Sequence, residues 1–202
     1  MLDRALSALI QRPLVALAHG AVALNLRADT ITFAGFFVGM AAALAIAAGQ
    51  PLWGLALMLS SRLLDGLDGA VARLTAPTDR GAFLDITLDF LFYASIPLAF
   101  AIVDPANNAL AAAVLLAAFM GTASSFLAFA VLAERRGLKS EAWPHKGLFY
   151  LGGLTEASET LICFVLMCLW PAHFAWLAYA FAALCGLTIV GRLAAGWQAF
   201  RV

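Results

Sequence analysis

Charged residues are scarce in this sequence. They make up 12% of its 202 residues, whereas 64% are hydrophobic. A soluble domain of this size needs a much larger polar surface, so this scarcity excludes an ordinary soluble protein and indicates a membrane protein. There is no surplus of positive charge either, since twelve basic residues are matched by twelve acidic ones. We therefore expect no nucleic-acid partner.

Cysteine is also rare, and Cys163, Cys168 and Cys185 all lie in apolar surroundings. An odd number of cysteines in such segments argues against a disulfide framework. The three are not spaced as close pairs, which argues against a metal site built from thiolates.

Hydrophobic residues occur in six long runs, each comparable to the roughly 20 helical residues that cross the core of a bilayer. The runs cover residues 30–48, 51–74, 81–103, 109–132, 148–170 and 172–197. This pattern predicts an all-α membrane protein with six transmembrane helices. Because no repeat or change of composition marks a second unit, residues 1–202 are expected to form a single domain, with the six-helix bundle over 28–202.

Residues 1–27 differ from the six runs, because Arg4, Gln11, Arg12 and Pro13 interrupt their apolar residues. These interruptions argue against a signal peptide and predict an amphipathic helix that lies in the membrane interface. A disordered or loosely packed terminus is the alternative.

Basic residues fall on one side of the predicted membrane. The connections on the other side, around Gln50, Asp104 and His173, contain no Lys or Arg. By the positive-inside rule, both termini are expected to face the cytoplasm. The residues on the basic side are Arg4, Arg12, Arg27, Arg73, Arg80, Arg135, Arg136, Lys139, Lys146 and Arg201.

Four aspartates lie within or beside two neighbouring apolar runs, in the segment DGLDGAVARLTAPTDRGAFLDITLD. Asp65 and Asp68 are three residues apart and share one face of the second helix, and Asp85 and Asp89 are four apart on the third. A short turn joins these helices and predicts antiparallel neighbours, so the four carboxylates can meet at one depth. A carboxylate at lipid depth costs about 2.5–3.5 kcal/mol unless it finds a partner, which indicates a functional cluster.

Carboxylates that converge repel one another and need protons or cations to neutralise them. Oxygen ligands suit Mg²⁺ or Mn²⁺ better than zinc, and two such ions in one cluster form a clamp for phosphoryl transfer. A structural or proton-relay acid cluster is the alternative.

Small residues follow the aspartates. Gly69 and Ala72 leave a shallow wall on the same helix, where a nucleotide or diphosphate can approach the backbone. Arg73 adds a cation suited to a phosphate oxygen. Glycine in membrane helices also serves plain helix packing, so the aspartates beside it are what favour a ligand.

Two consecutive motifs stand in this segment: Asp65-x-x-Asp68-Gly69-x-x-Ala72-Arg73 and Gly81-x-x-x-Asp85-x-x-x-Asp89. Together they resemble the signature of the CDP-alcohol phosphatidyltransferase family, which are integral membrane enzymes of phospholipid synthesis. All eight specified positions match. The spacer between Arg73 and Gly81 has seven residues, where eight or nine is usual in the family.

The resemblance implies a role for each of these residues. Asp65, Asp68 and Asp85 would hold two divalent cations, Mg²⁺ or Mn²⁺, and Asp89 would lie close to the second ion and act as general base. The substrates would be a CDP-linked lipid such as CDP-diacylglycerol and an acceptor alcohol, with CMP released. The resemblance also implies a homodimer in the inner membrane of a bacterium, with the active site facing the cytoplasm.

The nucleotide site implied by the resemblance comprises Gly69, Ala72, Arg73, Gly81, Thr32 and Asp29. Asp29 and Thr32 belong to a stretch similar to a Pro-Asn-x-x-Thr entry common in the family, with Ala28 and Asp29 in place of Pro and Asn. An ordinary helix N-cap by Asp29 or Thr30 is the alternative.

The acceptor candidates lie in the second half of the chain: Lys146, Arg192, Glu156 and Glu159. In relatives that use a phosphorylated acceptor, basic residues in comparable places bind its phosphate, which favours a phosphorylated polyol such as glycerol 3-phosphate or inositol phosphate. Glu156 and Glu159 could contact a polyol or an amine, or could pair with Arg62 or Arg192 and only stabilise the bundle. Lys146 could equally be a positive-inside anchor.

Two other functions compete with the enzyme. A cation or proton transporter predicts acids spread along a path across the membrane. A catalytically inactive scaffold of the same fold predicts the loss of at least one aspartate, whereas all four are present.

Overall fold

The computed structural model describes residues 2–137 and 153–201, and side chains from Pro13 onward. Lys146 lies outside these residues. The described chain consists of helices joined by short non-helical segments and contains no strand. Its elements are α1 (Leu2–Ala23), α2 (Ala28–Ala47), α3 (Pro51–Leu74), α4 (Asp79–Val103), α5 (Pro105–Arg135), α6 (Ala157–Leu169), the 3₁₀ turn η1 (Pro171–His173) and α7 (Phe174–Ala199).

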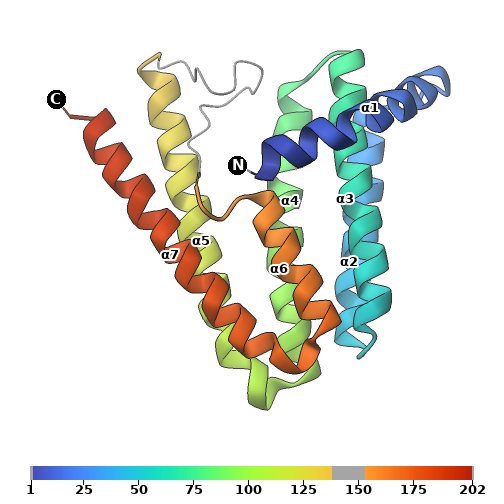
Figure 1. The fold of residues 1–202 in the computed structure, drawn as a ribbon. Coiled ribbons are helices and arrows are strands. Elements are labelled where there is room, and N and C mark those ends of the chain that lie inside the picture. The colour runs from blue at the N-terminus through green and yellow to red at the C-terminus, as the bar shows by residue number, and fades with distance from the viewer. Residues whose placement is uncertain (1, 138–152, 202) are drawn as a thin grey trace.

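Helices α2 to α7 run up and down, and α1 lies across one end of them (Figure 1). The turn between α3 and α4 lies at this same end, as does the C-terminal end of α7. Ala18 and Ala21 of α1 pack against Ile31 of α2 and against Ala70 and Val71 of α3. The crosswise position suits the predicted interfacial helix, whose place in a bilayer stays a prediction.

Four helical segments of the described chain are long and apolar enough to cross a membrane: Ala28–Ala47, Asp79–Val103, Pro105–Arg135 and Pro171–Ala199. Helix α3 also has 24 residues, but its second half carries several charged side chains, including Arg62, Asp65 and Asp68. The all-helical fold is confirmed, whereas the number of spans and the side on which the termini lie stay predictions.

The predicted helix over 148–170 is wrong at its start in the part that the structure describes. Residues 153–156 are not helical, and α6 begins only at Ala157, with 13 residues. The physical cause is a capping box. The Glu156 side chain accepts from the backbone of Glu159, and the Glu159 side chain accepts from the backbone N–H of Glu156 at 3.1 Å. These bonds replace the missing intrahelical partners of a first turn.

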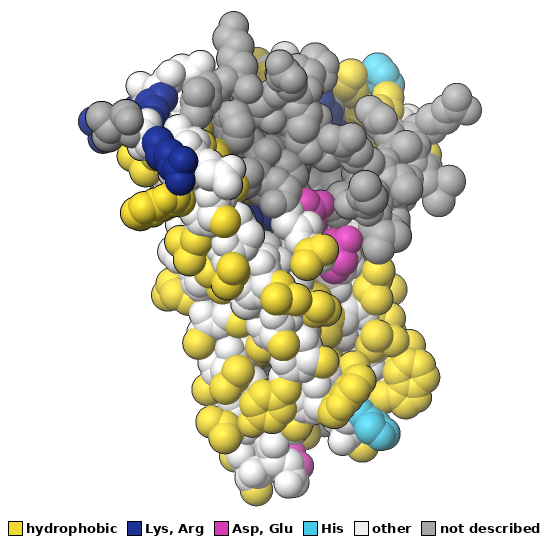
Figure 2. Space-filling view, turned by 60° about the vertical axis from the view of Figure 1, so that its left-hand side comes forward, with side chains coloured by type: hydrophobic (Ala, Val, Ile, Leu, Met, Phe, Trp, Pro, Cys, Tyr) yellow, Lys and Arg dark blue, Asp and Glu magenta, His cyan; other side chains and the backbone are white. Residues whose placement is uncertain are grey.

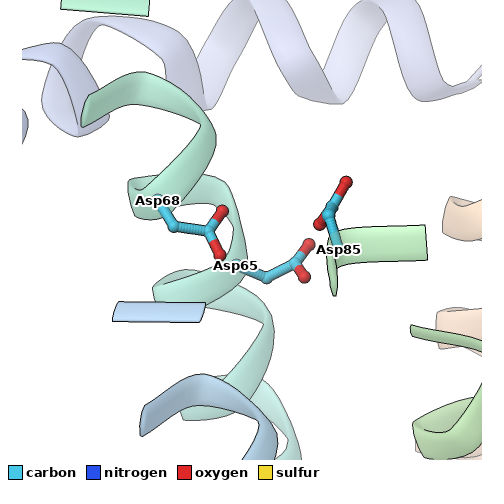
Figure 3. Close-up of side chains that lie close together, drawn as sticks. All are labelled: Asp65, Asp68 and Asp85. Atoms are coloured by element: carbon cyan, nitrogen blue, oxygen red, sulfur yellow. The ribbon is translucent and has the colours of Figure 1, made fainter. Parts of the chain in front are cut away.

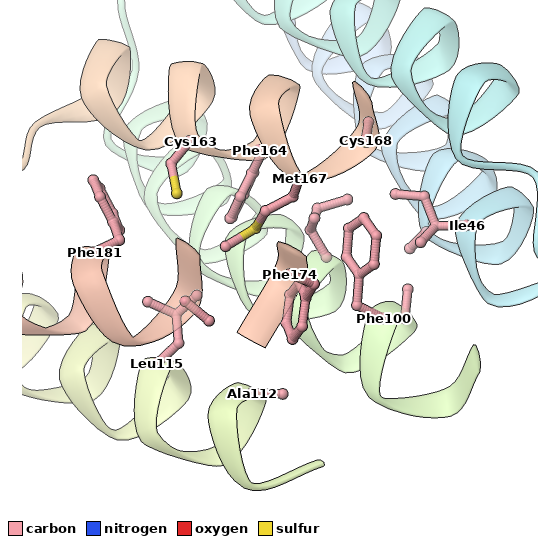
Figure 4. Close-up of a cluster of buried hydrophobic side chains, with 14 of the residues drawn as sticks. Ile46, Phe100, Ala112, Leu115, Cys163, Phe164, Met167, Cys168, Phe174 and Phe181 are labelled. Carbon is pink, nitrogen blue, oxygen red and sulfur yellow. The ribbon is translucent and has the colours of Figure 1, made fainter. Parts of the chain in front are cut away.

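The main hydrophobic core is formed by side chains from all helices from α2 to α7, and Figure 4 shows part of it. Its largest fully buried side chains include Ile46, Phe92, Phe164 and Phe174. The rings of Phe100 and Phe174 stack with their centres 4.7 Å apart and connect α4 to α7. This packing fixes the part of α4 that follows Asp85 and Asp89.

Large apolar side chains also cover the outside of the bundle. Leu44, Leu98, Leu110 and Leu193 are all more than half exposed. Figure 2 shows hydrophobic side chains over the flank it displays. An exposed apolar surface of this extent is expected where a protein faces lipid.

Helix α2 packs against both α3 and α4. The expected antiparallel course of α3 and α4 is seen in Figure 1, but α2 forms the common support. Gly39 makes this close packing possible, because a Cβ there would lie 2.7 Å from the Phe92 ring and 2.9 Å from Ser61 Oγ. Small residues let membrane helices approach in this way.

Replacing Gly39 with alanine tests this close approach. We expect Gly39→Ala to lower the stability of the purified protein by about 1–3 kcal/mol, because the added methyl group must displace a packed ring and a hydroxyl. Thermal unfolding in detergent measures the change. Gly186→Ala is the matched control, since a Cβ there meets no atom within 4 Å. Equal melting temperatures for both variants would contradict the packing argument.

Candidate active site

Three carboxylates converge between α3 and α4. One oxygen from each of Asp65, Asp68 and Asp85 lies within 4.8 Å of the other two (Figure 3). Asp68 is buried, with 5% of its surface exposed, Asp65 is half-buried and Asp85 is exposed. The helical spacing of Asp65 and Asp68 therefore puts both on the face of α3 that meets Asp85 of α4.

Asp89 lies one turn beyond Asp85 and is held by an arginine. Its Oδ1 accepts a hydrogen bond from Arg62 Nη1 at 2.6 Å, and the same nitrogen lies 3.5 Å from Asp65 Oδ1. Asp89 is not in the group of three whose oxygens lie within 4.8 Å, but Arg62 connects it to Asp65.

The cluster fits a divalent metal ion. Asp68 Oδ2 is buried and has no hydrogen-bond partner among the described residues. A buried carboxylate oxygen without a donor is costly, and a cation would satisfy it. All three donors are carboxylate oxygens at one place, which is the ligand chemistry that Mg²⁺ and Mn²⁺ prefer.

The start of α2 meets the start of α4 beside the cluster. Asp29 forms an ion pair with Arg80, and Gly81 N donates to Thr78 Oγ1 at 3.0 Å, which caps α4. A Cβ on Gly81 would lie 3.5 Å from Asp29 Oδ1. Asp29 and Gly81 therefore lie close together, and their place in a nucleotide site stays a prediction.

The alternative that Asp29 or Thr30 caps α2 is wrong. The N-cap residue is Arg27, which makes no side-chain capping bond, and the Asp29 carboxylate forms an ion pair with Arg80 instead. Thr32 Oγ1 donates to the carbonyl of Ala28 at 3.0 Å, and its hydroxyl lies beside the Asp68 carboxylate.

Arg73 lies beside Gly69. A Cβ on Gly69 would be 3.3 Å from Arg73 Nη1, so the guanidinium lies over the bare backbone of the previous turn. Arg73 is exposed and Ala72 is half-buried. This arrangement leaves a cation at the surface next to small residues, and its predicted role toward a phosphate stays a prediction.

Two of the acceptor candidates line one pocket of about 450 Å³ between the start of α6 and α7. Its lining includes Gly153, Glu156, Thr188 and Arg192. Arg192 is buried and its Nη1 donates to the carbonyl of Thr122 at 2.9 Å, which ties α7 to α5.

Glu156 and Glu159 are engaged with the backbone in the described structure. Glu156 Oε1 accepts from Gly153 N at 3.0 Å, in addition to the capping box. The predicted alternative, pairing with Arg62 or Arg192, is not seen among the ion pairs of the described residues. Arg62 instead forms ion pairs with Asp65 and Asp89.

Arg62 is the site residue that sequence reasoning missed. The sequence suggests Arg62 only as a partner for Glu156 and Glu159. Its spacing carried a usable signal, because a residue three positions before Asp65 lies on the same helix face. A cation in an apolar run also needs an acidic partner nearby, and the cluster offers one.

Comparison with known proteins identifies the family of this chain. The family model described as CDP-alcohol phosphatidyltransferase matches residues 25–190. The chain belongs to the CDP-alcohol phosphatidyltransferase family.

Two curated relatives show how far this likeness reaches. The inner membrane protein YnjF of Escherichia coli (strain K12) is 50% identical over 169 residues, which cover 84% of this chain and 82% of YnjF. Archaetidylinositol phosphate synthase of Methanothermobacter thermautotrophicus is 51% identical over 67 residues, covering 33% of this chain and 34% of that protein.

Solved structures share the fold. Mycobacterium tuberculosis phosphatidylinositol phosphate synthase (PgsA1) with CDP-DAG bound superimposes with a TM-score of 0.73 at 24% identity, covering 92% of this chain and 94% of that one. The same protein in complex with manganese and citrate gives a TM-score of 0.72, with 91% and 88% covered.

Removing one carboxylate tests the metal site. We expect Asp68→Asn to weaken Mn²⁺ binding by at least about tenfold, because the cluster loses one of its charged oxygen ligands. Electron paramagnetic resonance of free Mn²⁺ measures the affinity. Asp79→Asn is the matched control, an exposed aspartate in the first turn of α4 outside the cluster. Equal affinities for the two variants would refute a metal site at Asp68.

Proposed function

We propose that this protein transfers a phosphatidyl group, a substituted phosphate, from a CDP-linked lipid such as CDP-diacylglycerol to the hydroxyl of an acceptor alcohol, with release of CMP. The observation that carries the proposal is the convergence of Asp65, Asp68 and Asp85 within 4.8 Å, in a segment that the family model covers. The similar fold of PgsA1, solved with CDP-DAG bound, supports the choice of donor.

Two divalent cations, Mg²⁺ or Mn²⁺, are proposed as cofactors, with Asp65, Asp68, Asp85 and Asp89 as the residues that would hold them. When bound, the cations would neutralise the diphosphate and stabilise CMP as a leaving group. The orphaned Asp68 Oδ2 supports this assignment, and so does the manganese complex of PgsA1.

The nucleotide is proposed to lie along the wall made by Gly69 and Ala72, with Arg73 toward a phosphate oxygen. The corner of Asp29, Thr32 and Gly81 borders the same space. The ion pair of Asp29 with Arg80 fixes the start of α2 relative to α4 there.

Asp89 is proposed as the general base. It accepts the proton of the acceptor hydroxyl while that oxygen forms a bond to the β-phosphorus of the donor. The bond from the β-phosphorus to the bridging oxygen breaks, and its electron pair leaves with CMP. Arg62 occupies Asp89 Oδ1.

The acceptor is proposed to be a phosphorylated polyol such as glycerol 3-phosphate or inositol phosphate. Arg192 and Glu156 line one pocket, which places a cation and an acid where a phosphate and hydroxyl groups would be distinguished. Glu159 would support the pocket through its bond to the Glu156 backbone. Lys146 stays a proposed phosphate contact on the basis of its position in the sequence.

The protein is proposed to span the inner membrane of a bacterium as a homodimer, with the active site toward the cytoplasm. The likeness to the inner membrane protein YnjF supports the location, and the one-sided distribution of Lys and Arg supports the orientation. Three of the acids gather at one place, which speaks against a transporter path, and the four aspartates of the motif speak against an inactive scaffold.

The reaction is tested with purified protein, CDP-diacylglycerol, Mg²⁺ or Mn²⁺ and a panel of alcohols, following CMP release. We expect Asp89→Asn to lower turnover by about 100-fold or more while CDP binding is kept, because the proton acceptor is lost. Glu134→Gln, at the exposed end of α5, is the control and should behave as the wild type. Undiminished turnover in Asp89→Asn would eliminate the base, and the absence of CMP release with every alcohol would refute the proposed reaction.

The acceptor is tested with Arg192→Met. We expect the KM for a phosphorylated acceptor to rise about tenfold, because an anion loses its cation, while the KM for serine stays unchanged. Arg135→Met, an exposed arginine, is the control. Since Arg192 also bonds Thr122, melting temperatures are compared first. An equal loss with both acceptors would show that Arg192 does not select a phosphate.

A further inference from the structure

Arg62 is a buried cation to which the proposed reaction assigns no chemical step. Its side chain is 12% exposed, although it lies in a helix whose neighbours are apolar. A charge in such a place needs compensation, and Arg62 finds it in two residues of the carboxylate cluster. Its Nη1 lies 2.6 Å from Asp89 Oδ1 and 3.5 Å from Asp65 Oδ1.

The guanidinium is fixed from several sides. It stacks over the Phe92 ring, with its central carbon 4.0 Å from the ring centre. Arg62 Nη2 donates to Ser61 Oγ at 3.3 Å, and Ser61 in turn donates to the carbonyl of Gly35 at 2.8 Å. Arg62 is therefore held by α2, α3 and α4 together, which is the support a precise orientation requires.

This contact has two physical consequences for the cluster. Because Nη1 holds Asp89 Oδ1, the carboxylate cannot rotate freely, and Oδ2 is left as the oxygen for other partners. A fixed positive charge beside Asp65 and Asp89 also repels any divalent cation that these residues bind.

We propose that Arg62 is a positioning residue, which orients Asp89 so that Oδ2 receives the proton of the acceptor and which lowers the affinity of the aspartate cluster for divalent cations. The first part rests on the proposed role of Asp89 as general base. The second part concerns the charge of the cluster and holds whichever alcohol is the acceptor.

The two parts predict opposite changes when the arginine is removed. In Arg62→Gln we expect kcat for CMP release to fall at least about tenfold, with KM values nearly unchanged, because the base loses its orientation. We expect Mn²⁺ to bind about three- to tenfold more tightly, because a repelling charge is gone. Electron paramagnetic resonance of free Mn²⁺, without substrate, measures the second effect.

Arg62→Lys separates charge from geometry, since lysine keeps the positive charge without the planar fork. We expect Mn²⁺ affinity near that of the wild type and a kcat that stays reduced. Arg136→Gln is the matched control, because Arg136 also lies over an aromatic ring, that of Phe200, and bonds two carbonyl groups away from the cluster. Both its kcat and its Mn²⁺ affinity should equal those of the wild type.

Several results would overturn the proposal. A loss of activity in Arg62→Gln together with weaker Mn²⁺ binding would mean that Arg62 only supports the fold. An unchanged kcat in Arg62→Gln, or full recovery in Arg62→Lys, would remove the orienting role. If the wild type released no CMP with any alcohol, the proposed function would fail separately, and the Mn²⁺ comparison would decide whether Arg62 opposes cation binding.

Discussion

Mutual repulsion among carboxylates governs the architecture of this site. Asp65, Asp68 and Asp85 have oxygens within 4.8 Å of one another, and Asp89 joins them through Arg62. The negative charges of these carboxylates repel one another, and partial burial increases the cost of this repulsion. Positive charge close to them is therefore needed to compensate it. Arg62 supplies part of that charge from within the chain, and the orphaned oxygen of Asp68 marks where more is needed. The charge of the site therefore suits the cations proposed to bind there.

Convergence depends in turn on how closely the backbones approach. Helix α2 supports both α3 and α4, and the absence of a side chain at Gly39 leaves the volume into which Phe92 and Ser61 fit. The guanidinium of Arg62 stacks on the Phe92 ring and donates a hydrogen bond to Ser61 Oγ. Apolar packing and charge placement are thus two parts of one arrangement, because the same residues that close the core also orient the ionic groups.

The sequence predicted those features that depend on local spacing. The three-residue and four-residue intervals of the aspartates placed them on helix faces, and a short turn joined the two helices that carry them. Features that depend on tertiary partners were harder to predict. Arg62 could have paired with any nearby acid, and only the packing of α3 and α4 on α2 selects Asp89. For Asp29, a helix cap and a place beside the nucleotide were both open from the sequence, and the ion pair with Arg80, 51 residues further along the chain, was not predicted.

The start of helix α6, in the second half of the chain, was also not predicted from the sequence. Hydrophobicity alone predicted a helix that begins at residue 148, because polar interruptions within it are few. The capping box of Glu156 and Glu159 instead sets the start of α6, and its hydrogen bonds became visible only with the backbone in place.

One consequence concerns the pocket at the start of α6. Because the helix begins at Ala157, Gly153 and Glu156 lie in an irregular segment beside Thr188 and Arg192 rather than on a continuous helix. Backbone groups there are held by side chains, as in the bonds from Gly153 to Glu156 and from Thr155 to Thr188. An irregular segment can present both backbone and side-chain groups to a polar ligand, which a regular helix cannot do. The same break, which hydrophobicity did not predict, puts Glu156 in the pocket that Arg192 also lines, where the acceptor is proposed to bind.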